Sequence, residues 1–367
     1  MLTPFDDLDQ YLALPRLTGL RLAPDGTWLA VSMSALSPDR RTFKPSIWRL
    51  DTTPGPGGPR PAIRLTRSAE GEDSPAFLPD GGLLFLSSRP APPGAAAPGA
   101  GAPGAGAPAP GTGPARSAIP GGPAAPADAP GKRALWLLPA AGGEPYLLRS
   151  APGGISRLAT ACAAPVAAFT APVLPGADGQ AEDAGRRKAR ADAGVTAILH
   201  SAPLVRYWDH DLGPDELRLL VTATRDGAEA EQPRDLTRGP GRALDEHSFE
   251  LTPDGRHAVT GWSVADDRGD LRKEVVVLDT ATGARRVLLS APGTDFSAPR
   301  VSPDGTRVLA IAERHETYHE PAEVTVMVVP LDGGDPADLL PGCDRWPEEA
   351  AWSADGTSVF VTAADRG

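Results

Sequence analysis

Apolar and polar residues alternate along several short stretches of the chain, and each stretch is centred on a turn of the Pro-Asp-Gly type. The copy SAPRVSPDGTRVLAIA, residues 297–312, has one alternating segment before the turn and another after it. A side-chain period of two predicts β-strands, and Pro, Asp and Gly each favour a backbone conformation found in tight turns, so each copy predicts a β-hairpin. The five copies cover residues 17–32, 73–88, 246–261, 297–312 and 348–363.

A second pattern follows most of these hairpins. In EVVVLDTATGARRVLLS, residues 274–290, two apolar segments flank a turn that contains Gly283, which predicts two more strands. The wide interval between Asp80 and Asp254 holds a further hairpin at 155–174, whose turn has lost its Asp-Gly pair. The segments with the second pattern are 46–67, 134–149, 218–238, 274–290 and 323–340.

Repeated units of four strands indicate an all-β protein, namely a β-propeller of four-stranded blades. The strand count gives five complete blades and the first hairpin of a sixth, with the whole chain, residues 1–367, as one propeller domain. Propellers protect their sheet edges by closing the ring. The pattern therefore predicts an open or truncated ring, with a closing blade expected beyond Gly367.

Two segments interrupt the repeats. Residues 90–131 are almost entirely Ala, Gly and Pro, and such a composition predicts a disordered loop inside blade 2 because little apolar surface offsets the entropy of ordering it. Residues 175–210 form an insertion in blade 3. Within it, AEDAGRRKARADAG predicts a short helix that ends at Gly194, with the basic cluster 186–190 on a solvated face.

Charge and cysteine content exclude several classes of partner. The chain has 36 Lys and Arg against 47 Asp and Glu, a net charge of -11, and we expect neither a nucleic acid nor a membrane as partner. Cys162 and Cys343 are far apart and form no metal-binding motif, so we expect no cofactor and no metal, and a reducing cytoplasm fits. The amino terminus lacks the pattern of a cleaved signal peptide.

Three stretches carry a resemblance to a known family. FDDLDQYLALPRLTGLRLAPDG (5–26), VTAILHSAPLVRYWDHDLG (195–213) and PRDLTRG (233–239), together with the repeated hairpins, resemble the N-terminal propeller of the prolyl oligopeptidase family of serine peptidases. The acylaminoacyl-peptidase and dipeptidyl-peptidase-like branches are the most similar. The resemblance covers essentially the whole chain.

The resemblance implies a two-domain serine peptidase, in which the propeller caps a C-terminal α/β-hydrolase domain and restricts the substrates to short peptides. The catalytic Ser, Asp and His of the family lie in the hydrolase domain, so no catalytic residue is carried over to this chain, which we expect to be inactive alone. Similar hairpins also occur in TolB-like propellers. A stand-alone propeller that serves as a protein-binding scaffold is therefore the alternative.

Two motifs match catalytic patterns only in part. HETYH, residues 315–319, matches the zinc signature HExxH, but it lies between two predicted strands and Pro321 follows it, so the required helix is not expected. GWSVA, residues 261–265, has Ala265 where a serine nucleophile elbow needs its second Gly. Both are expected to be structural.

Two segments rich in aromatic and charged residues are candidates for contact with a substrate or a partner domain. One is RYWDHD, residues 206–211, for which two interpretations stay open: Trp208 packs between blades, or the segment faces the substrate. The other is the loop around the HETYH stretch. The candidate residues are Arg206, Tyr207, Trp208, Asp209, His315 and His319.

Overall fold

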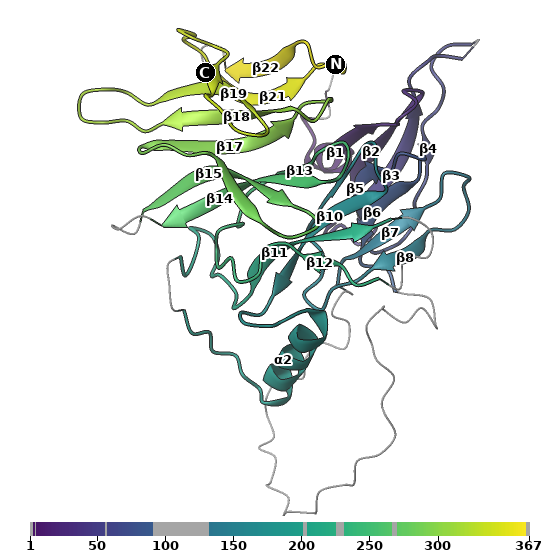
Figure 1. Ribbon diagram of the computed structural model, residues 1–367. Helices are drawn as coiled ribbons and strands as arrows, with labels where there is room; N and C mark the ends of the chain where they lie inside the picture. Colours follow the sequence, from purple (N-terminus) through teal and green to yellow (C-terminus); the bar gives the residue numbers. More distant parts are fainter. Residues whose placement is uncertain are drawn as a thin grey trace, which may run out of the picture.

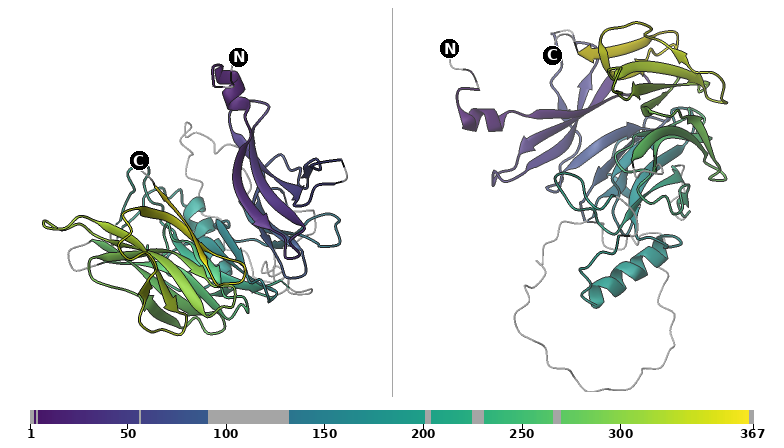
Figure 2. Two further views of the ribbon diagram at one scale, coloured as in Figure 1. Left: turned by 90° about the horizontal axis from the view of Figure 1, so that it is seen from above. Right: turned by 90° about the vertical axis from the view of Figure 1, so that its left-hand side faces the viewer.

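The computed structural model describes residues 3, 5–55, 57–90, 132–200, 204–224, 231–265 and 270–364. It contains five four-stranded antiparallel sheets and one two-stranded sheet, and in each of them neighbouring strands are consecutive in sequence. The sheets follow one another around an arc, from the purple first sheet to the yellow last one (Figures 1 and 2). This confirms the predicted all-β propeller with five complete blades and the first hairpin of a sixth.

Each sheet is one blade. Blade 1 follows helix α1 (Leu8–Ala13) and contains β1 (Arg16–Leu22), β2 (Trp28–Leu36), β3 (Phe43–Asp51) and β4 (Ile63–Arg64). Blade 2 contains β5 (Glu72–Phe77), β6 (Leu83–Ser87), β7 (Ala134–Leu138) and β8 (Tyr146–Arg149). Blade 3 contains β9 (Arg157–Thr160), β10 (Val166–Val173), β11 (Glu216–Ala223) and β12 (Arg234–Asp235), with helix α2 (Gln180–Asp192) between β10 and β11.

The remaining blades have no helix in the described part of the chain. Blade 4 contains β13 (Phe249–Leu251), β14 (His257–Ala265), β15 (Leu271–Asp279) and β16 (Arg285–Leu289). Blade 5 contains β17 (Thr294–Val301), β18 (Arg307–Arg314), β19 (Glu323–Pro330) and β20 (Ala337–Asp338). Blade 6 contains β21 (Trp346–Trp352) and β22 (Val359–Ala364).

The Pro-Asp-Gly turns connect the first and second strands as predicted. In blade 5, Gly305 has a φ of 74°, a conformation that glycine adopts without strain, and the Asp304 carboxylate accepts the Thr306 N–H at 3.0 Å. In blade 3, which lacks the Asp-Gly pair, the Ala161 N–H donates to the Val166 carbonyl at 3.0 Å and closes an equivalent turn. The turn sequence can therefore vary while the hairpin persists.

Five clusters of buried apolar side chains hold the blades together, one between each pair of consecutive blades. The cluster between blades 1 and 2, for example, joins Ile47 to Phe85 and Trp136. The cluster between blades 5 and 6 joins Leu309 to Ala350. Among the described residues, no such cluster joins blade 6 to blade 1. The described ring is therefore open, and the first blade stands apart from the last in the left-hand view of Figure 2.

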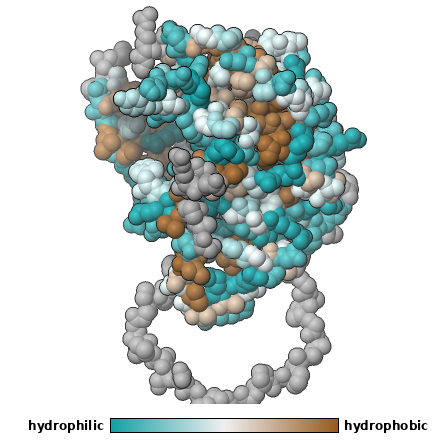
Figure 3. Space-filling model, turned by 60° about the vertical axis from the view of Figure 1, so that its left-hand side comes forward, coloured by the Kyte–Doolittle hydropathy of each residue, from teal (hydrophilic) through white to brown (hydrophobic). Residues whose placement is uncertain are grey.

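Open ends leave apolar side chains uncovered. On β1, Leu17 and Leu22 are exposed, and on β22 Phe360 is 67% exposed. Figure 3 shows one face of the molecule, where a few hydrophobic patches interrupt a mainly hydrophilic surface. Helices are few, and across the described ranges none is long and apolar enough to cross a lipid bilayer.

The segment 175–210, expected as an insertion in blade 3, runs from the end of β10 toward β11 and holds α2. The helix ends before Gly194, whose φ is 61°. The buried Asp183 fixes it, because its carboxylate accepts the Leu174 N–H at 2.9 Å and pairs with Arg187 at 2.9 Å. The predicted loop at 90–131 lies outside the described residues, apart from Pro90.

Candidate functional site

One face of the propeller carries the connections between the second and third strands. In an antiparallel sheet successive connections lie at alternate ends, so in each of the five four-stranded blades these connections lie at the end opposite the turn between the first and second strands. We call this the loop face and define it by the described connections 37–42, 174–200, 204–215 and 315–322. Both candidate segments lie on it.

The RYWDHD segment forms a small exposed turn. Arg206 and Asp211 are bridged as in a short hairpin, and the Tyr207 N–H donates to the His210 carbonyl at 2.9 Å. Trp208 lies at the tip and is 93% exposed. The interpretation that Trp208 packs between blades was wrong, because its side chain is almost fully exposed. Asp209 contacts the His210 ring, with Oδ1 and Nδ1 2.6 Å apart.

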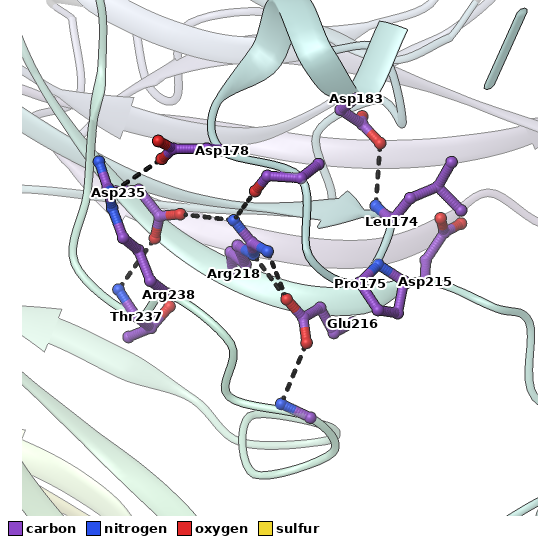
Figure 4. Close-up of polar contacts among 12 residues, drawn as sticks. Leu174, Pro175, Asp178, Asp183, Asp215, Glu216, Arg218, Asp235, Thr237 and Arg238 are labelled. Carbon is purple, nitrogen blue, oxygen red and sulfur yellow. Dashed lines mark hydrogen bonds and ion pairs between the residues drawn. The ribbon is translucent and has the colours of Figure 1, made fainter. Parts of the chain in front are cut away.

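A polar network fixes the base of this insertion to blade 3 (Figure 4). Arg218 is buried and pairs with Glu216 at 2.5 Å and with Asp235 at 3.0 Å. Burial lowers the pKa of the Arg218 guanidinium, but its hydrogen bonds to the two carboxylates outweigh burial and hold the pKa above its ordinary value.

The PRDLTRG motif belongs to the same network. The Asp235 carboxylate accepts the Thr237 N–H at 2.9 Å, and the Thr237 hydroxyl accepts the Leu219 N–H at 2.8 Å. The motif therefore completes the outer edge of blade 3.

The HETYH stretch is an irregular loop between β18 and β19. The Thr317 N–H donates to the Glu320 carbonyl at 2.8 Å, and Tyr318 at the tip is 96% exposed. Because the loop is not helical, His315 and His319 lack the one-face spacing that zinc binding by this motif requires. Throughout the described ranges, no group of three metal-ligating side chains is present.

His315 is attached to blade 5, whereas His319 lies on the exposed tip beside Tyr318. The His315 N–H donates to the Gly293 carbonyl at 2.9 Å, and its Nε2 lies 3.5 Å from Oδ1 of Asp295. Asp295 also accepts the Lys273 N–H at 2.9 Å, and the Lys273 ammonium lies 3.7 Å from its other oxygen. The Asp295 carboxylate thus lies between His315 and Lys273 and joins blades 4 and 5 on the loop face.

A histidine and a serine lie beside this group. Nε2 of His247 is 2.8 Å from Oγ of Ser263, and Arg157 of blade 3 donates to the His247 carbonyl. Burial, then the charges of Lys273 and Arg157, lowers the pKa of His247 from 6.5 to about 4. The sequence singled out Ser263 but not His247. The hairpin predicted at 246–261 brings the two segments together, but the strand pattern does not show that these two side chains are in contact.

The Ser263 and His247 pair does not form a nucleophile site. An imidazole with a pKa near 4 is a weak general base at neutral pH. Ser263 pairs with Lys273 in the middle of a β-ladder and donates its own N–H to the Ala243 carbonyl at 2.8 Å, whereas an elbow serine sits at a strand-to-helix turn. The pair joins the segment before β13 to blade 4.

We expect the 367-residue chain alone not to hydrolyse an acyl-aminoacyl chromogenic substrate, because His247 is too weak a base to activate Ser263 at neutral pH. The measurement is a release assay on the purified chain and on Ser263→Ala. Turnover by the wild type that is lost in Ser263→Ala is the contrary result.

The depressed pKa of His247 makes folding dependent on pH. Between pH 6.5 and about 4 the unfolded chain binds more protons at this residue than the folded chain. The contribution of neutral His247 to the free energy of unfolding is therefore fully present above pH 6.5 and is lost as the pH falls toward 4. From pH 7 to 4.5 we expect a loss of about 2 kcal/mol from this group. Urea unfolding of the wild type and of His247→Gln at both pH values measures this loss, which should be absent from the variant. The same pH dependence of stability in both proteins would contradict the prediction.

The fold of this chain is similar to that of several solved structures. No protein-family model matches the chain, and no curated protein matches its sequence. Among solved structures, the acylaminoacyl peptidase of Pyrococcus horikoshii superposes with a TM-score of 0.59 at 11% identity, over 96% of this chain and 43% of its own. The β-propeller domain of the trilobed protease from Pyrococcus furiosus gives 0.54 at 13% identity, over 96% of this chain and 78% of its own.

The chain has the fold of these peptidase propellers. It spans less than half the length of the acylaminoacyl peptidase. An oligogalacturonate lyase superposes with a TM-score of 0.56 at 10% identity, over 94% of this chain and 69% of its own. Since proteins of different activity share this propeller, the fold by itself does not fix the reaction.

Proposed function

We propose that this chain is the gating and substrate-selecting propeller of a serine peptidase of the prolyl oligopeptidase family that acts on short peptides. The catalytic Ser, Asp and His belong to an α/β-hydrolase domain outside this chain. The observation that carries the proposal is the superposition of 96% of the chain on an acylaminoacyl peptidase, together with the three family-like sequence stretches.

The loop face supports this role. Exposed aromatic side chains at the tips of two loops, Trp208 and Tyr318, suit contact with a second domain or with a peptide, because large rigid side chains offer contact area at a low entropic cost. Charged groups lie close to both tips: Asp209 beside Trp208, and Arg314 paired with Glu320 beside Tyr318. We assign the interface or the substrate path to this face. A cytoplasmic location is part of the proposal and accords with free, exposed Cys162 and Cys343.

The test is the reading frame of the gene past the codon for Gly367. The proposal expects the remaining strands of the propeller, then a Gly-x-Ser-x-Gly-Gly elbow followed by an Asp and a His. A stop codon directly after one closing blade would instead support a stand-alone scaffold propeller and would refute the peptidase.

A further inference from the structure

A cavity lies at the outer edge of blade 3, where blade 4 and the residues before helix α2 approach that edge. Its volume is about 320 Å³, which is near the lower limit for a site that holds a small molecule. Most of its wall comes from β12 of blade 3 and the residues beside that strand. The turn between β15 and β16 and the residue before α2 complete it. The lining residues are Gly179, Pro233, Arg234, Asp235, Arg238 and Thr282.

Three separate segments of the chain meet at this cavity. A Cβ at Gly283, the residue after Thr282, would lie 3.6 Å from the Leu236 carbonyl oxygen, so the turn of blade 4 lies against the residue that follows β12. The Arg238 guanidinium pairs at 2.8 Å with Asp178, which precedes α2 (Figure 4). The edge of blade 3 is thus in contact with both the turn of blade 4 and the insertion.

Cationic side chains outnumber free carboxylates in the lining. Asp235 is the one acidic lining residue, and both its oxygens are occupied: Oδ1 accepts the Thr237 N–H at 2.9 Å, and Oδ2 lies 3.0 Å from Arg218. Arg234 is exposed and, within the described ranges, forms no ion pair. An anion that enters the cavity therefore meets at least one guanidinium group without a competing carboxylate.

The second arginine of the lining is weakly held. Arg238 and its partner Asp178 have side chains that are 71% and 70% exposed, and an ion pair so exposed adds little to stability and can open. A ligand replaces Asp178 only if it attracts Arg238 more strongly than that carboxylate does. A phosphate group carries a charge of about -1.5 to -2 at neutral pH and three acceptor oxygens, so it can bond to two guanidinium groups at once.

We propose that this cavity binds the phosphate group of a small polar molecule, with Arg234 and Arg238 as the residues that hold it. The lining contains no large apolar side chain, which favours a polar ligand. A ligand that fills the cavity contacts both blades and the insertion, and its binding stabilises the folded chain. None of the lining residues belongs to the RYWDHD or HETYH segments, and the site does not depend on the proposed function.

The test is isothermal titration calorimetry of the 367-residue chain at pH 7 and constant ionic strength, because salt screens exposed charges. The ligands are sodium phosphate, glycerol 3-phosphate and, as a dicarboxylate of similar charge, succinate. One variant is Arg234→Gln, which loses no ion pair, and the other is Asp178→Asn, which removes the carboxylate that competes for Arg238. The matched control is Arg256→Gln, which removes the same charge from an 80% exposed side chain at the turn of blade 4.

We expect saturable binding of at least one phosphate compound, about tenfold weaker in Arg234→Gln, unchanged in Arg256→Gln and about threefold tighter in Asp178→Asn. Equal affinity for the two phosphate compounds identifies the free ion as a sufficient ligand, and tighter binding of glycerol 3-phosphate identifies a phosphate ester. The phosphate site is overturned by no saturable binding of either compound, by equal affinity for succinate, or by the same loss in Arg234→Gln and Arg256→Gln. The proposed function stands in each of these cases.

Discussion

Replacing Glu216 with alanine is expected to lower the free energy of unfolding by about 3–5 kcal/mol. Glu216 accepts two hydrogen bonds from Arg218, at 2.8 and 2.5 Å, and its second oxygen accepts the Gly241 N–H at 3.3 Å. The Arg218 side chain is only 3% exposed, so the variant leaves a buried guanidinium with one carboxylate, Asp235, in place of two. Urea unfolding of both proteins at pH 7 gives the difference.

The matched control for this change is Glu182→Ala on helix α2. Glu182 also pairs with an arginine, Arg186 at 2.6 Å, but both side chains are 43% exposed and solvent weakens the pair. The expected loss there is small, because an exposed ion pair contributes little to stability. If both variants lost the same small amount, the network under the insertion would not hold blade 3 together, and the rigid placement of the RYWDHD turn would lose its basis.

Replacing Leu309 with alanine is expected to lower the free energy of unfolding by about 2–5 kcal/mol, whereas Phe360→Ala in the same chain should change it by less than about 1 kcal/mol. The two residues hold the same place in their hairpins, because Leu309 pairs with Arg300 and Phe360 pairs with Ala351, each five residues after its turn Asp. Leu309 is fully buried against blade 6, while Phe360 is 67% exposed.

This pair of variants tests the register and the open ring together. The larger side chain should give the smaller effect, which no argument from residue type alone predicts. The urea midpoints of the two variants give the comparison. Equal losses would mean that Phe360 is packed in solution, and the blade order described above would then need another closing contact. In a longer protein with a blade beyond β22, Phe360→Ala should become as destabilising as other buried Phe→Ala changes, about 3–5 kcal/mol.

The repeat could be predicted because its information is local. The alternation of apolar and polar residues predicts the strands, and turns such as Asp304–Gly305 predict where each hairpin reverses. Both the number and the order of the strands therefore followed from the sequence. Even the hairpin at 155–174 was found without its Asp-Gly pair, because its two apolar segments and the spacing of its neighbours remained.

The side-chain contacts of the candidate site could not be predicted from the sequence. His247 and Ser263 lie across one hairpin, as do Asp295 and His315, but alternation of apolar and polar residues does not give the distances between these side chains. The approach of Lys273 in blade 4 to Asp295 in blade 5 depends on the packing of two blades. For Trp208 the sequence left open whether it packs between blades or faces a substrate, and the structure leaves the side chain exposed.

The most direct test of the proposed function uses cells that express the gene encoding this chain. Their extract is treated with a tagged fluorophosphonate, which reacts with activated serines, and the protein is then recovered with antibodies raised against this chain. We expect a labelled polypeptide larger than 37.9 kDa that contains these propeller sequences, with the label on a serine outside residues 1–367. Recovery of the propeller in an unlabelled polypeptide, with label only on unrelated proteins, would contradict the account.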